Sequence, residues 1–370
     1  MTKSKNYFHT KLVPVEEWTD WRWQMRNSIC SVHELKERLS LGDQEEKQIE
    51  QCLARLKMRI TPYYLSLVDE ADPHDPIRLQ CVPQIYELIG CPEESVDCLQ
   101  EREYSPVTGL VHRYPDRVLF LATSSCYMYC RHCTRRHFVS KTPNVDMKQQ
   151  YDRCFQYIRE HKEIRDVVVS GGDPLTLSDE MLEYILRSIR EIEHVEIIRI
   201  GSRVPVVLPF RITDELCAMI ERYHPVWFNT HFNHPREVTD EAKAACAKLL
   251  AHGIPLNNQS VLLAGVNDSV EVMKELVLKL MAARVRPYYL YECDLVEGLG
   301  HFRTPVSKGV EIIEGLRGWT TGLAVPTFVI DTPGGRGKVP IQPEYVVNSL
   351  PDKLVLRNYR NEKIVYSLKR

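Results

Sequence analysis

The hydrophobic positions follow two different rhythms along the chain, and the rhythm changes near residue 105. Before that point, apolar residues recur at helical spacing. The clearest series falls at i, i+3, i+4, i+7 and i+11 and ends where Pro62 breaks the helix or starts the next element. We therefore expect a helical N-terminal region, residues 1–104. Its helices carry Trp18, Trp21, the stretch from Leu35 to Leu39, and the series Ile49, Cys52, Leu53, Leu56 and Ile60.

After residue 105, short apolar runs alternate with segments of helical period. Six such runs are RVLFLATS, DVVVSGG, VEIIRIGS, VWFNTHF, PLNNQSVLL and RPYYLYECD, and a seventh, AVPTFVID, follows the last helical segment. Alternating strands and helices predict a parallel sheet with helical crossovers. Six units, rather than eight, predict an α/β fold with a partial (β/α)6 TIM-like barrel over residues 105–322. A C-terminal segment, residues 323–370, follows it.

Polar residues stand where each of these predicted strands ends. In β/α barrels the chemistry collects at the C-terminal ends of the strands, so we expect the functional groups at this end of the barrel. The strand ends carry Ser124 with a cysteine cluster, Gly171 to Asp173, Gly201 to Arg203, Asn229 to His234, Gln259, Asp294 and Asp331.

The composition argues against several classes of protein. Lys plus Arg is 48 and Asp plus Glu is 50, which gives a formal net charge of −2. A protein that binds nucleic acid through its phosphates usually carries a basic excess, so we expect no nucleic-acid partner. No apolar run approaches the roughly 20 residues that span a bilayer, and the N-terminus lacks the apolar core of a secretory signal. We expect the twelve cysteines in a reducing cytoplasm, where a spaced cluster indicates metal binding or catalysis.

The first chemical motif is CYMYCRHCTRR, in which Cys126, Cys130 and Cys133 follow the spacing C-x3-C-x2-C. Thiolates hold iron–sulfur clusters, and a four-iron cluster usually takes four of them. Three thiolates on one loop leave one iron open, and an open metal position is a reactive one. Two alternatives stand beside this interpretation: a tetrahedral zinc site completed by His132 or His137, and three cysteines buried for structural reasons.

The second motif is DTPGGRGK, which places Lys338 at the end of a glycine-rich turn. A lysine at such a position suits a Schiff base with pyridoxal phosphate, and the turn alone could cradle a phosphate. It is not a P-loop, because the G-x4-G-K-[ST] spacing is absent. In a third motif, SGGDPL, Gly171 and Gly172 either let the backbone approach a ligand closely or form an ordinary turn between a strand and a helix.

The spacing of the three cysteines after a first strand resembles that of the radical S-adenosylmethionine enzymes. Further segments make the resemblance specific to the lysine 2,3-aminomutase family: RYPDRV, CRHCTRR, SGGDPL, GSRVPVVLP, NTHFNHPRE, NQSVLL, HFRTPVSKG and PGGRGK. The resemblance runs from about Tyr104 to the C-terminus and is weaker before it. Two rival classes are a radical enzyme that acts on RNA or protein and an iron–sulfur protein that only transfers electrons or senses redox state. The lysine turn argues against both.

The resemblance implies three cofactors. It implies a [4Fe-4S] cluster on the three cysteines and S-adenosylmethionine on the open iron. It also implies pyridoxal 5′-phosphate on Lys338, with its phosphate held by Arg113 and Arg117 through the forked donors of arginine. For S-adenosylmethionine it implies the SGGDPL segment and, as weaker candidates, residues at later strand ends. These are Gly171, Gly172 and Asp173, followed by Arg203, His231 and Gln259.

The resemblance also implies the substrate. Arg135 matches the arginine that binds the α-carboxylate, and Asp294 and Asp331 match the positions that read the far end of the side chain. Two carboxylates facing one ligand require a cation between them. This fits L-lysine and leaves arginine as the alternative, whereas the glutamate-specific relatives lack the acidic pair.

The implied enzyme is an isomerase that converts L-lysine into L-β-lysine (3,6-diaminohexanoate). In the implied reaction a 5′-deoxyadenosyl radical removes a hydrogen from C3, the amino group moves from C2 to C3, and the hydrogen returns. An external electron donor reduces the cluster. The arginine alternative would be an arginine 2,3-aminomutase with the same mechanism.

Three positions depart from the family pattern. Arg336 stands where the family has glycine, Phe210 where we expect a polar residue, and Ser269 where the larger members have cysteine. Those members also carry a cysteine-rich C-terminal tail that binds zinc between subunits, and no cysteine follows Cys293 here. We therefore expect no structural zinc, and a homo-oligomer whose subunit number the resemblance does not fix.

Overall fold

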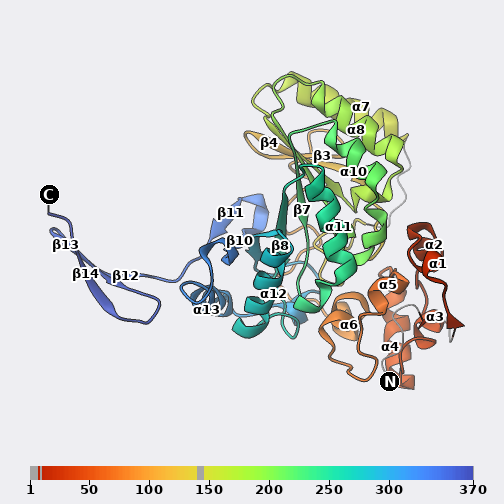
Figure 1. Cartoon of the computed structure of the whole chain (residues 1–370), viewed down its shortest axis with the longest axis horizontal. Coiled ribbons are helices and arrows are strands. Elements are labelled where there is room, and N and C mark those ends of the chain that lie inside the picture. The colour runs from red at the N-terminus through yellow and green to blue at the C-terminus, as the bar shows by residue number, and fades with distance from the viewer. Residues whose placement is uncertain (1–6, 9–10, 140–145, 370) are drawn as a thin grey trace.

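The computed structural model describes residues 7–8, 11–139 and 146–369. A sheet of nine strands organises the chain (Figure 1). Its parallel strands are β4 (Arg117–Thr123), β5 (Asp166–Gly171), β6 (Ile197–Gly201), β7 (Val226–Thr230), β8 (Leu256–Val261), β9 (Arg286–Tyr291) and β10 (Thr327–Asp331).

Helices connect these strands in the order that the sequence predicts. The crossovers contain α7 (Met147–Glu160), α8 (Asp179–Arg190), α9 (Val204–Val207), α10 (Asp214–Glu221), α11 (Asp240–Ala251), α12 (Val270–Ala282) and α13 (Val306–Leu316). Short 3-10 helices lie at Ile85–Leu88 (η1), Pro174–Thr176 (η2), Pro209–Arg211 (η3), Pro235–Glu237 (η4), Gly300–Phe302 (η5), Gly322–Ala324 (η6) and Pro333–Gly335 (η7). The six predicted strand–helix units are therefore confirmed, and the seventh apolar run forms β10.

Two antiparallel strands form the edges of the sheet. β3 (Leu110–Tyr114) pairs with β4, and β11 (Lys338–Pro340) pairs with β10. The edges do not pair as strands, but the sheet curls until their side chains meet. The hydroxyl of Tyr114 lies 3.1 Å from the backbone N of Lys338, and Arg113 reaches Asp331 at 3.1 Å. The prediction of a partial barrel is confirmed, and the contacts across its seam lie at the predicted lysine turn.

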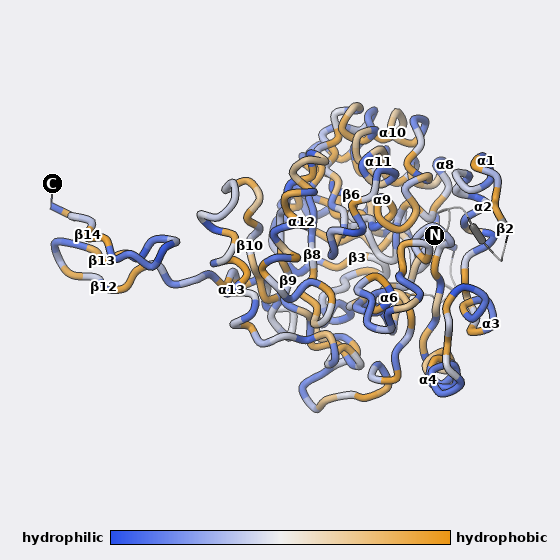
Figure 2. The backbone as a smooth tube through the Cα atoms, turned by 60° about the horizontal axis from the view of Figure 1, so that its bottom comes forward, coloured by the Kyte–Doolittle hydropathy of each residue, from blue (hydrophilic) through white to orange (hydrophobic). Residues whose placement is uncertain are grey.

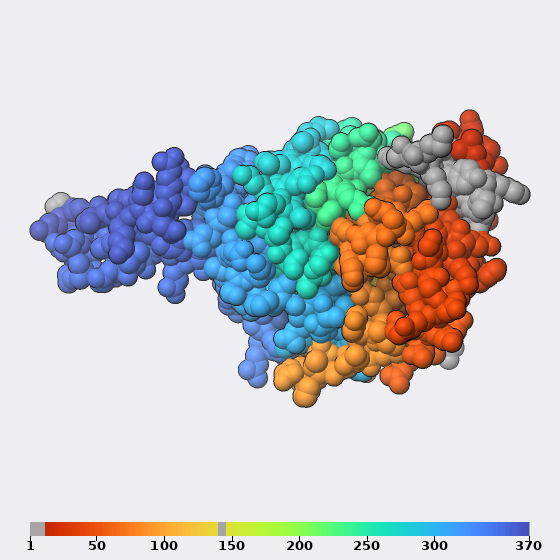
Figure 3. All heavy atoms as spheres, turned by 90° about the horizontal axis from the view of Figure 1, so that it is seen from below, coloured from red at the N-terminus to blue at the C-terminus, as the bar shows by residue number. Residues whose placement is uncertain are grey.

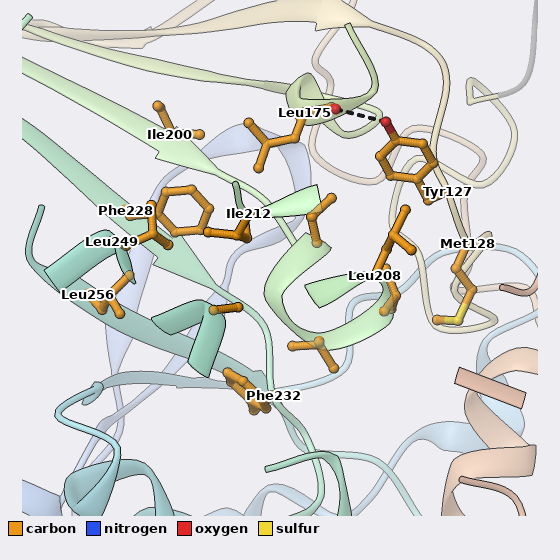
Figure 4. Close-up of a cluster of buried hydrophobic side chains, with 14 of the residues drawn as sticks. Tyr127, Met128, Leu175, Ile200, Leu208, Ile212, Phe228, Phe232, Leu249 and Leu256 are labelled. Carbon is orange, nitrogen blue, oxygen red and sulfur yellow. Dashed lines mark hydrogen bonds between the residues drawn. The ribbon is translucent and has the colours of Figure 1, made fainter. Parts of the chain in front are cut away.

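The barrel core forms where buried strand residues meet the helices that cover the outside of the sheet. β5 alternates between half-buried and buried positions, and β6 does the same. Figure 4 shows part of this core, where Ile200 and Phe228 from the strands meet residues of the crossover segments such as Leu208 and Ile212. Burying one such side chain stabilises the fold by roughly 1.5–3 kcal/mol.

The N-terminal region packs against one end of the barrel (Figure 1). It comprises the short strands β1 (Tyr7–Phe8) and β2 (Lys11–Leu12), the 3-10 helix η1, and six α-helices. These helices are α1 (Val15–Trp18), α2 (Trp21–Arg26), α3 (Val32–Lys36), α4 (Asp43–Leu53), α5 (Pro62–Leu65) and α6 (Pro76–Cys81).

One helix prediction in this region is wrong. α4 ends at Leu53, so the helix does not continue to Ile60. Leu56 and Ile60 are buried, but Ile60 forms an antiparallel bridge with Ile29. Thr61 precedes a proline, which disfavours helical backbone, and its side chain caps α5. The buried residues from Ile49 to Ile60 follow helical spacing, but they belong to a helix and to an extended segment that follows it.

The C-terminal strands form an arm that projects from the body of the molecule (Figures 1 and 3). β12 (Val346–Leu350), β13 (Lys353–Arg357) and β14 (Lys363–Ser367) make a separate antiparallel sheet of three strands. Figure 2 shows hydrophobic stretches along it. Val346, Val365 and Tyr366 are 54%, 63% and 59% exposed, so the arm leaves large apolar side chains uncovered. Within the described residues, no helix has the length and hydropathy to cross a membrane.

Candidate active site

The three cysteines of the first motif lie on the loop that follows β4, at the C-terminal end of the parallel strands. All three thiols are free and half-buried. Residues 124–138 are called the cysteine loop below. The N-terminal region packs against this loop. Tyr129 donates its N–H to the carbonyl of Arg59 at 3.1 Å, and Arg131 donates to that of Gln80 at 2.9 Å. The loop is thus attached to two parts of the fold.

Two arginines of the cysteine loop converge on one buried carboxylate, Glu87 in η1. Arg131 donates through Nε to Oε1 at 3.0 Å and through Nη2 to Oε2 at 2.5 Å, and Arg136 donates to the same Oε2. Burial raises the pKa of Glu87, but the two guanidinium groups outweigh it and the net direction is downward. The carboxylate therefore stays ionised and holds the loop in one shape.

Arg203, just after β6, points at the cysteine loop. Its Nη1 lies 2.8 Å from Sγ of Cys130, and its Nη2 lies 2.8 Å from Oε1 of Glu237. Nη2 also donates to the side-chain amide oxygen Oε1 of Gln80 at 2.6 Å. Burial works against the charge of this arginine, but Cys130, Tyr64 and Glu237 outweigh burial and raise its pKa. The side chain is therefore placed as an outer donor to the Cys130 sulfur, a position that such groups occupy around metal sites.

The thiols themselves fit an iron–sulfur cluster. Burial, Asp173 and the other two thiols raise the pKa of Cys126, and burial and Cys130 raise that of Cys133 to about 11. Thiolates crowded in this way need cations among them, which the irons of a cluster supply. Among the described residues, no group of three or more His, Cys, Asp or Glu is arranged to hold a single metal ion.

The histidines that could have completed a zinc site have other surroundings. His132 is buried, packs edge-on against Phe302 and lies 3.2 Å from the side-chain amide of Asn233. His137 lies 3.3 Å from the carbonyl oxygen of Glu297. Both side chains therefore belong to the scaffold around the loop.

The glycines of SGGDPL bring the end of β5 against the start of the cysteine loop. Gly171 has a φ of +118°, and a Cβ there would lie 2.5 Å from the carbonyl oxygen of Thr123. Gly172 donates its N–H to that oxygen at 2.5 Å. A Cβ on Gly172 would lie 2.8 Å from the carbonyl carbons of Ser124 and Ser125. The close approach in this motif is between two protein segments.

Asp173 joins the ends of β5 and β6. It accepts hydrogen bonds from the hydroxyl of Ser202 at 2.8 Å, the N–H of Arg203 at 2.9 Å and the N–H of Leu175 at 3.1 Å. Burial raises its pKa to about 6. Its carboxylate, like the guanidinium of Arg203, is committed to protein partners, so both support the site from behind.

The ends of β7 and β8, by contrast, present polar groups that the protein uses little. Burial, followed by the charges of Arg203 and Arg135, lowers the pKa of His231 to about 4, so its ring is neutral. Gln259 donates one weak hydrogen bond, at 3.3 Å, to Tyr291. The hydroxyl of Thr230 is buried with no hydrogen-bond partner among the described residues. Such groups fit a polar ligand above the cysteine loop, as S-adenosylmethionine would be.

Lys338 is the first residue of β11 and follows a turn of left-handed glycines at 334, 335 and 337. Its Nζ donates to Asp331 Oδ2 at 2.7 Å and lies 5.6 Å from the centre of the Tyr291 ring. The turn closes through Thr332, which donates twice to the carbonyl of Gly337 at 2.7 and 2.9 Å. The primary amine is therefore held at the seam of the barrel, facing the site.

The two arginines that are predicted to bind the cofactor phosphate lie beside this lysine. Arg113 donates to Asp331 at 3.1 and 3.3 Å, and its guanidinium lies 5.2 Å from the Tyr114 ring. Arg117 lies on the same ring at 4.0 Å, pairs with Asp116 at 3.0 Å and is more exposed. Two forked cations and one amine around Tyr114 form a donor set that fits a phosphorylated aldehyde.

Asp294 and Asp331 are brought together as the sequence predicts. Burial, followed by the charge of Asp331, raises the pKa of Asp294 to about 7, while Lys338, Arg113 and Arg135 act in the opposite direction. Asp331 is almost fully enclosed, with 7% of its side chain exposed. Asp331 already pairs with Arg113 and Lys338, whereas these cations offset the charge of the buried Asp294 only in part.

Arg135 pairs with a partner that the sequence did not indicate, Glu101. Its Nε and Nη2 donate to the two carboxylate oxygens at 2.8 and 2.5 Å. Both residues line a cavity of about 310 Å³ between the cysteine loop and the segment before β3. Glu101, Glu87 and Glu237 were missed because no sequence spacing relates them to their partners, which lie 34 to 49 residues away.

Each of the three departures from the family pattern has a structural setting. Arg336 is exposed at the tip of the glycine turn. Phe210 packs edge-on against Tyr63 with ring centroids 5.4 Å apart. Ser269 caps α12 by accepting the N–H of Val272.

A half-open β/α barrel with three free thiols on the loop after its first parallel strand defines a radical S-adenosylmethionine enzyme. Residues 121–277 match the family model described as Radical SAM superfamily, and residues 313–368 match the one described as Lysine-2,3-aminomutase. The chain belongs to the lysine 2,3-aminomutase family, as the relatives below establish. It is therefore an isomerase that uses a [4Fe-4S] cluster, S-adenosylmethionine and pyridoxal phosphate.

The curated relatives match over nearly the whole chain. An L-lysine 2,3-aminomutase of Clostridium subterminale is 56% identical over 98% of this chain and 88% of its own length. The L-lysine 2,3-aminomutase of Bacillus subtilis (strain 168) is 53% identical over 94% and 74%. The glutamate 2,3-aminomutase of Clostridioides difficile (strain 630) is 44% identical over 94% and 82%. Of these three relatives, the two lysine enzymes are more similar to this chain than the glutamate enzyme is.

Proposed function

We propose that this chain interconverts L-lysine and L-β-lysine by moving the amino group between C2 and C3. The observation that carries the proposal is the enclosed pair of Asp294 and Asp331 beside Lys338. An amino acid with a positive charge on its side chain suits this place best, because a carboxylate would be repelled and a neutral group would leave the buried Asp294 without a direct cationic partner. The 53–56% identity to the lysine enzymes supports the same substrate.

The side chains of the site divide the binding of this substrate among them. Arg135 would hold the α-carboxylate through the part of its guanidinium that Glu101 leaves free, and Asp294 with Asp331 would hold the ε-ammonium. The arginine and the acidic pair therefore fix the two ends of the substrate. A lysine held at both ends would be restricted in how it lies, so that C3 could be presented to the cysteine loop.

The cofactors supply the chemistry that side chains cannot: when bound, the cluster with S-adenosylmethionine provides a radical, and pyridoxal phosphate carries the migrating nitrogen. Cys126, Cys130 and Cys133 would hold the cluster. Lys338 would hold the pyridoxal group, and Arg113 with Arg117 would hold its phosphate. When Lys338 is not bonded to the cofactor, Asp331 accepts a hydrogen bond from its Nζ and keeps the amine in place.

For S-adenosylmethionine we propose the half-buried surface formed by the ends of β5, β7 and β8. Gly171 and Gly172 shape its backbone wall, while His231 and Gln259 offer polar side chains. Asp173 and Arg203 act from behind this surface, because their charged groups already bind protein partners.

We also propose a cytoplasmic enzyme that receives electrons from an external donor and works as a homo-oligomer. The twelve cysteines, all free, support a reducing environment. The exposed apolar side chains of the β12–β14 arm support self-association, because patches of this kind mark interaction surfaces.

An anaerobic assay tests the substrate. The protein would be reconstituted with iron, sulfide, pyridoxal phosphate, S-adenosylmethionine and a reductant, and offered lysine, arginine and glutamate separately. We expect β-lysine, with little β-arginine and no β-glutamate, in mass-resolved chromatography. β-Arginine as the main product would keep the mechanism and refute the substrate. Deoxyadenosine without any shifted amino acid would refute the aminomutase reaction.

A further inference from the structure

The guanidinium of Arg135 is already engaged before any substrate binds. Nε donates to Glu101 Oε2 at 2.8 Å and Nη2 donates to Oε1 at 2.5 Å. The side chains of Arg135 and Glu101 are 21% and 19% exposed, so water screens this pair only in part. The pair uses one edge of the guanidinium. Within the described residues, the other edge, Nη1, donates to no protein group, and Arg135 is one of the residues that line the cavity.

Two explanations fit a carboxylate at this position. Glu101 could stand in for the substrate's α-carboxylate and leave when substrate arrives. Alternatively, it could stay and fix the arginine so that the free edge meets the substrate. The first requires Glu101 to move away, and the second requires it to be held firmly.

The backbone around Glu101 is held firmly. Asp97 accepts the N–H groups of Glu101 at 2.9 Å and of Arg102 at 3.1 Å. The hydroxyl of Ser105 donates to the carbonyl of Glu101 at 2.6 Å. These bonds fold residues 97–105 into a compact turn and fix the backbone from which the Glu101 side chain reaches Arg135, so the carboxylate starts from one place beside the guanidinium.

The same turn is docked on the glycine turn that carries Lys338. Gly334 donates its N–H to the carbonyl of Cys98 at 2.8 Å. A Cβ on Gly335 would lie 2.7 Å from the carbonyl oxygen of Leu99 and 2.6 Å from the ring of Tyr104. Residues 97–105 therefore touch both the arginine and the lysine turn, which are the two sides of the substrate site.

We propose that Glu101 is a positioning residue for substrate recognition: it holds Arg135 by its Nε and Nη2 edge and presents the Nη1 edge to the α-carboxylate of the amino acid. The proposal rests on the function proposed above. Residues 97–105 also fix the distance between the carboxylate-binding group and the lysine turn. The two explanations, that Glu101 competes with substrate and that it positions Arg135, predict opposite effects of a Glu101→Gln substitution on substrate binding. Removing the negative charge should strengthen carboxylate binding if Glu101 competes with substrate, and losing the fork should weaken it if Glu101 positions the arginine.

The test compares two ligands that differ only at the carboxylate. Holoenzyme without reductant, so that no turnover occurs, would be titrated with L-lysine and with L-lysinamide, whose amide is neutral. Binding would be read from the visible absorbance of the bound pyridoxal group. For Glu101→Gln we expect the Kd for lysine to rise roughly tenfold to hundredfold, the range for a lost hydrogen bond to a charged group. The Kd for lysinamide should stay unchanged.

Two further variants guard the interpretation. Glu103→Gln removes an exposed carboxylate from the same turn and should bind both ligands like the parent. Glu101→Asp keeps the charge but shortens the side chain, so it should weaken lysine selectively, and it serves if the glutamine variant does not fold.

The outcomes separate cleanly. Tighter or unchanged lysine binding in both Glu101 variants would overturn the positioning role. So would equal weakening of both ligands, which would indicate only a structural role. If lysine produces no absorbance change in the unsubstituted protein, the proposed function itself fails.

Discussion

Asp294 shows how one side chain links substrate binding to pH. An ordinary aspartate has a pKa near 3.9, whereas burial and the neighbouring Asp331 raise the pKa of Asp294 to about 7. An ammonium group between the two carboxylates favours the ionised form and lowers that pKa again. Lysine must therefore displace a proton when it binds below about pH 7.

The affinity for lysine should consequently fall as the pH drops below about 7, by up to tenfold per unit, because a raised pKa must be lowered on binding. The measurement is the Kd for L-lysine from the pyridoxal absorbance between about pH 5.5 and 8.5, a range set by ordinary side-chain titrations. L-Norleucine, which lacks the ε-amino group, controls for titration of the α-amino group and the cofactor. Asp294→Asn should bind lysine more weakly at high pH and lose the extra pH dependence. A lysine profile parallel to that of norleucine would contradict this assignment.

The residues that sequence could place share one property: their chemistry is visible in a local pattern. The three cysteines and Lys338 stand in short motifs, and Asp294 and Asp331 stand at strand ends. Glu101 and Glu87 stand in no such pattern. An acidic residue in a helical region normally faces water, so the sequence alone gives no reason to place either of them in the site. Only the fold shows that each is enclosed with an arginine of the cysteine loop.

Among the elements, the contact between the end of β5 and the start of the cysteine loop is the least tolerant of change. Gly172 has no room for a side chain, because a Cβ would press on the backbone of Ser124 and Ser125. Those atoms cannot move independently, since Asp173 donates its N–H to the carbonyl of Ser125 at 2.7 Å. The cysteine loop and SGGDPL must shift together or part.

A Gly172→Ala substitution should therefore destabilise the protein by roughly 1–3 kcal/mol, the usual cost of overpacking, and reduce the iron retained after reconstitution. Iron content and the midpoint of chemical unfolding are the two measurements. Gly42→Ala is the matched control, because a Cβ there meets nothing within 4 Å. If Gly172→Ala retained full iron and stability, the backbone contact would not be tight in solution.

The elements themselves divide in the same way between predictable and unpredictable. The six strand–helix units were visible because buried parallel strands appear as short apolar runs between amphipathic helices. The end of α4 could not be predicted from the sequence. Leu56 and Ile60 continue the helical spacing, although the helix has already ended at Leu53 and Ile60 is extended. The arm strands were missed because their residues are partly exposed on both faces, which removes the one-sided alternation that marks a strand.

In the whole molecule, the N-terminal region packs against one side of the barrel, and the β12–β14 arm projects from the opposite side (Figures 1 and 3). The N-terminal region supplies Glu87, Gln80 and Glu101 to the groups around the cysteine loop, so it forms part of the site. The arm lies far from that region (Figure 3) and contributes nothing to the site described here.

The arm should instead hold two copies of the chain together. A sheet of three short strands that exposes Val346, Val365 and Tyr366 lacks the covered apolar face that such sheets need for stability in water. Replacing Val365 with Asp places a charge in that face, so we expect a homo-oligomer to dissociate at micromolar concentration while the cluster and pyridoxal contents stay unchanged. Sedimentation velocity measures the assembly, and Lys363→Gln, an exposed change on the same strand, is the control. If the unsubstituted protein sediments as a monomer, or if Val365→Asp leaves the oligomer intact, self-association through the arm is refuted.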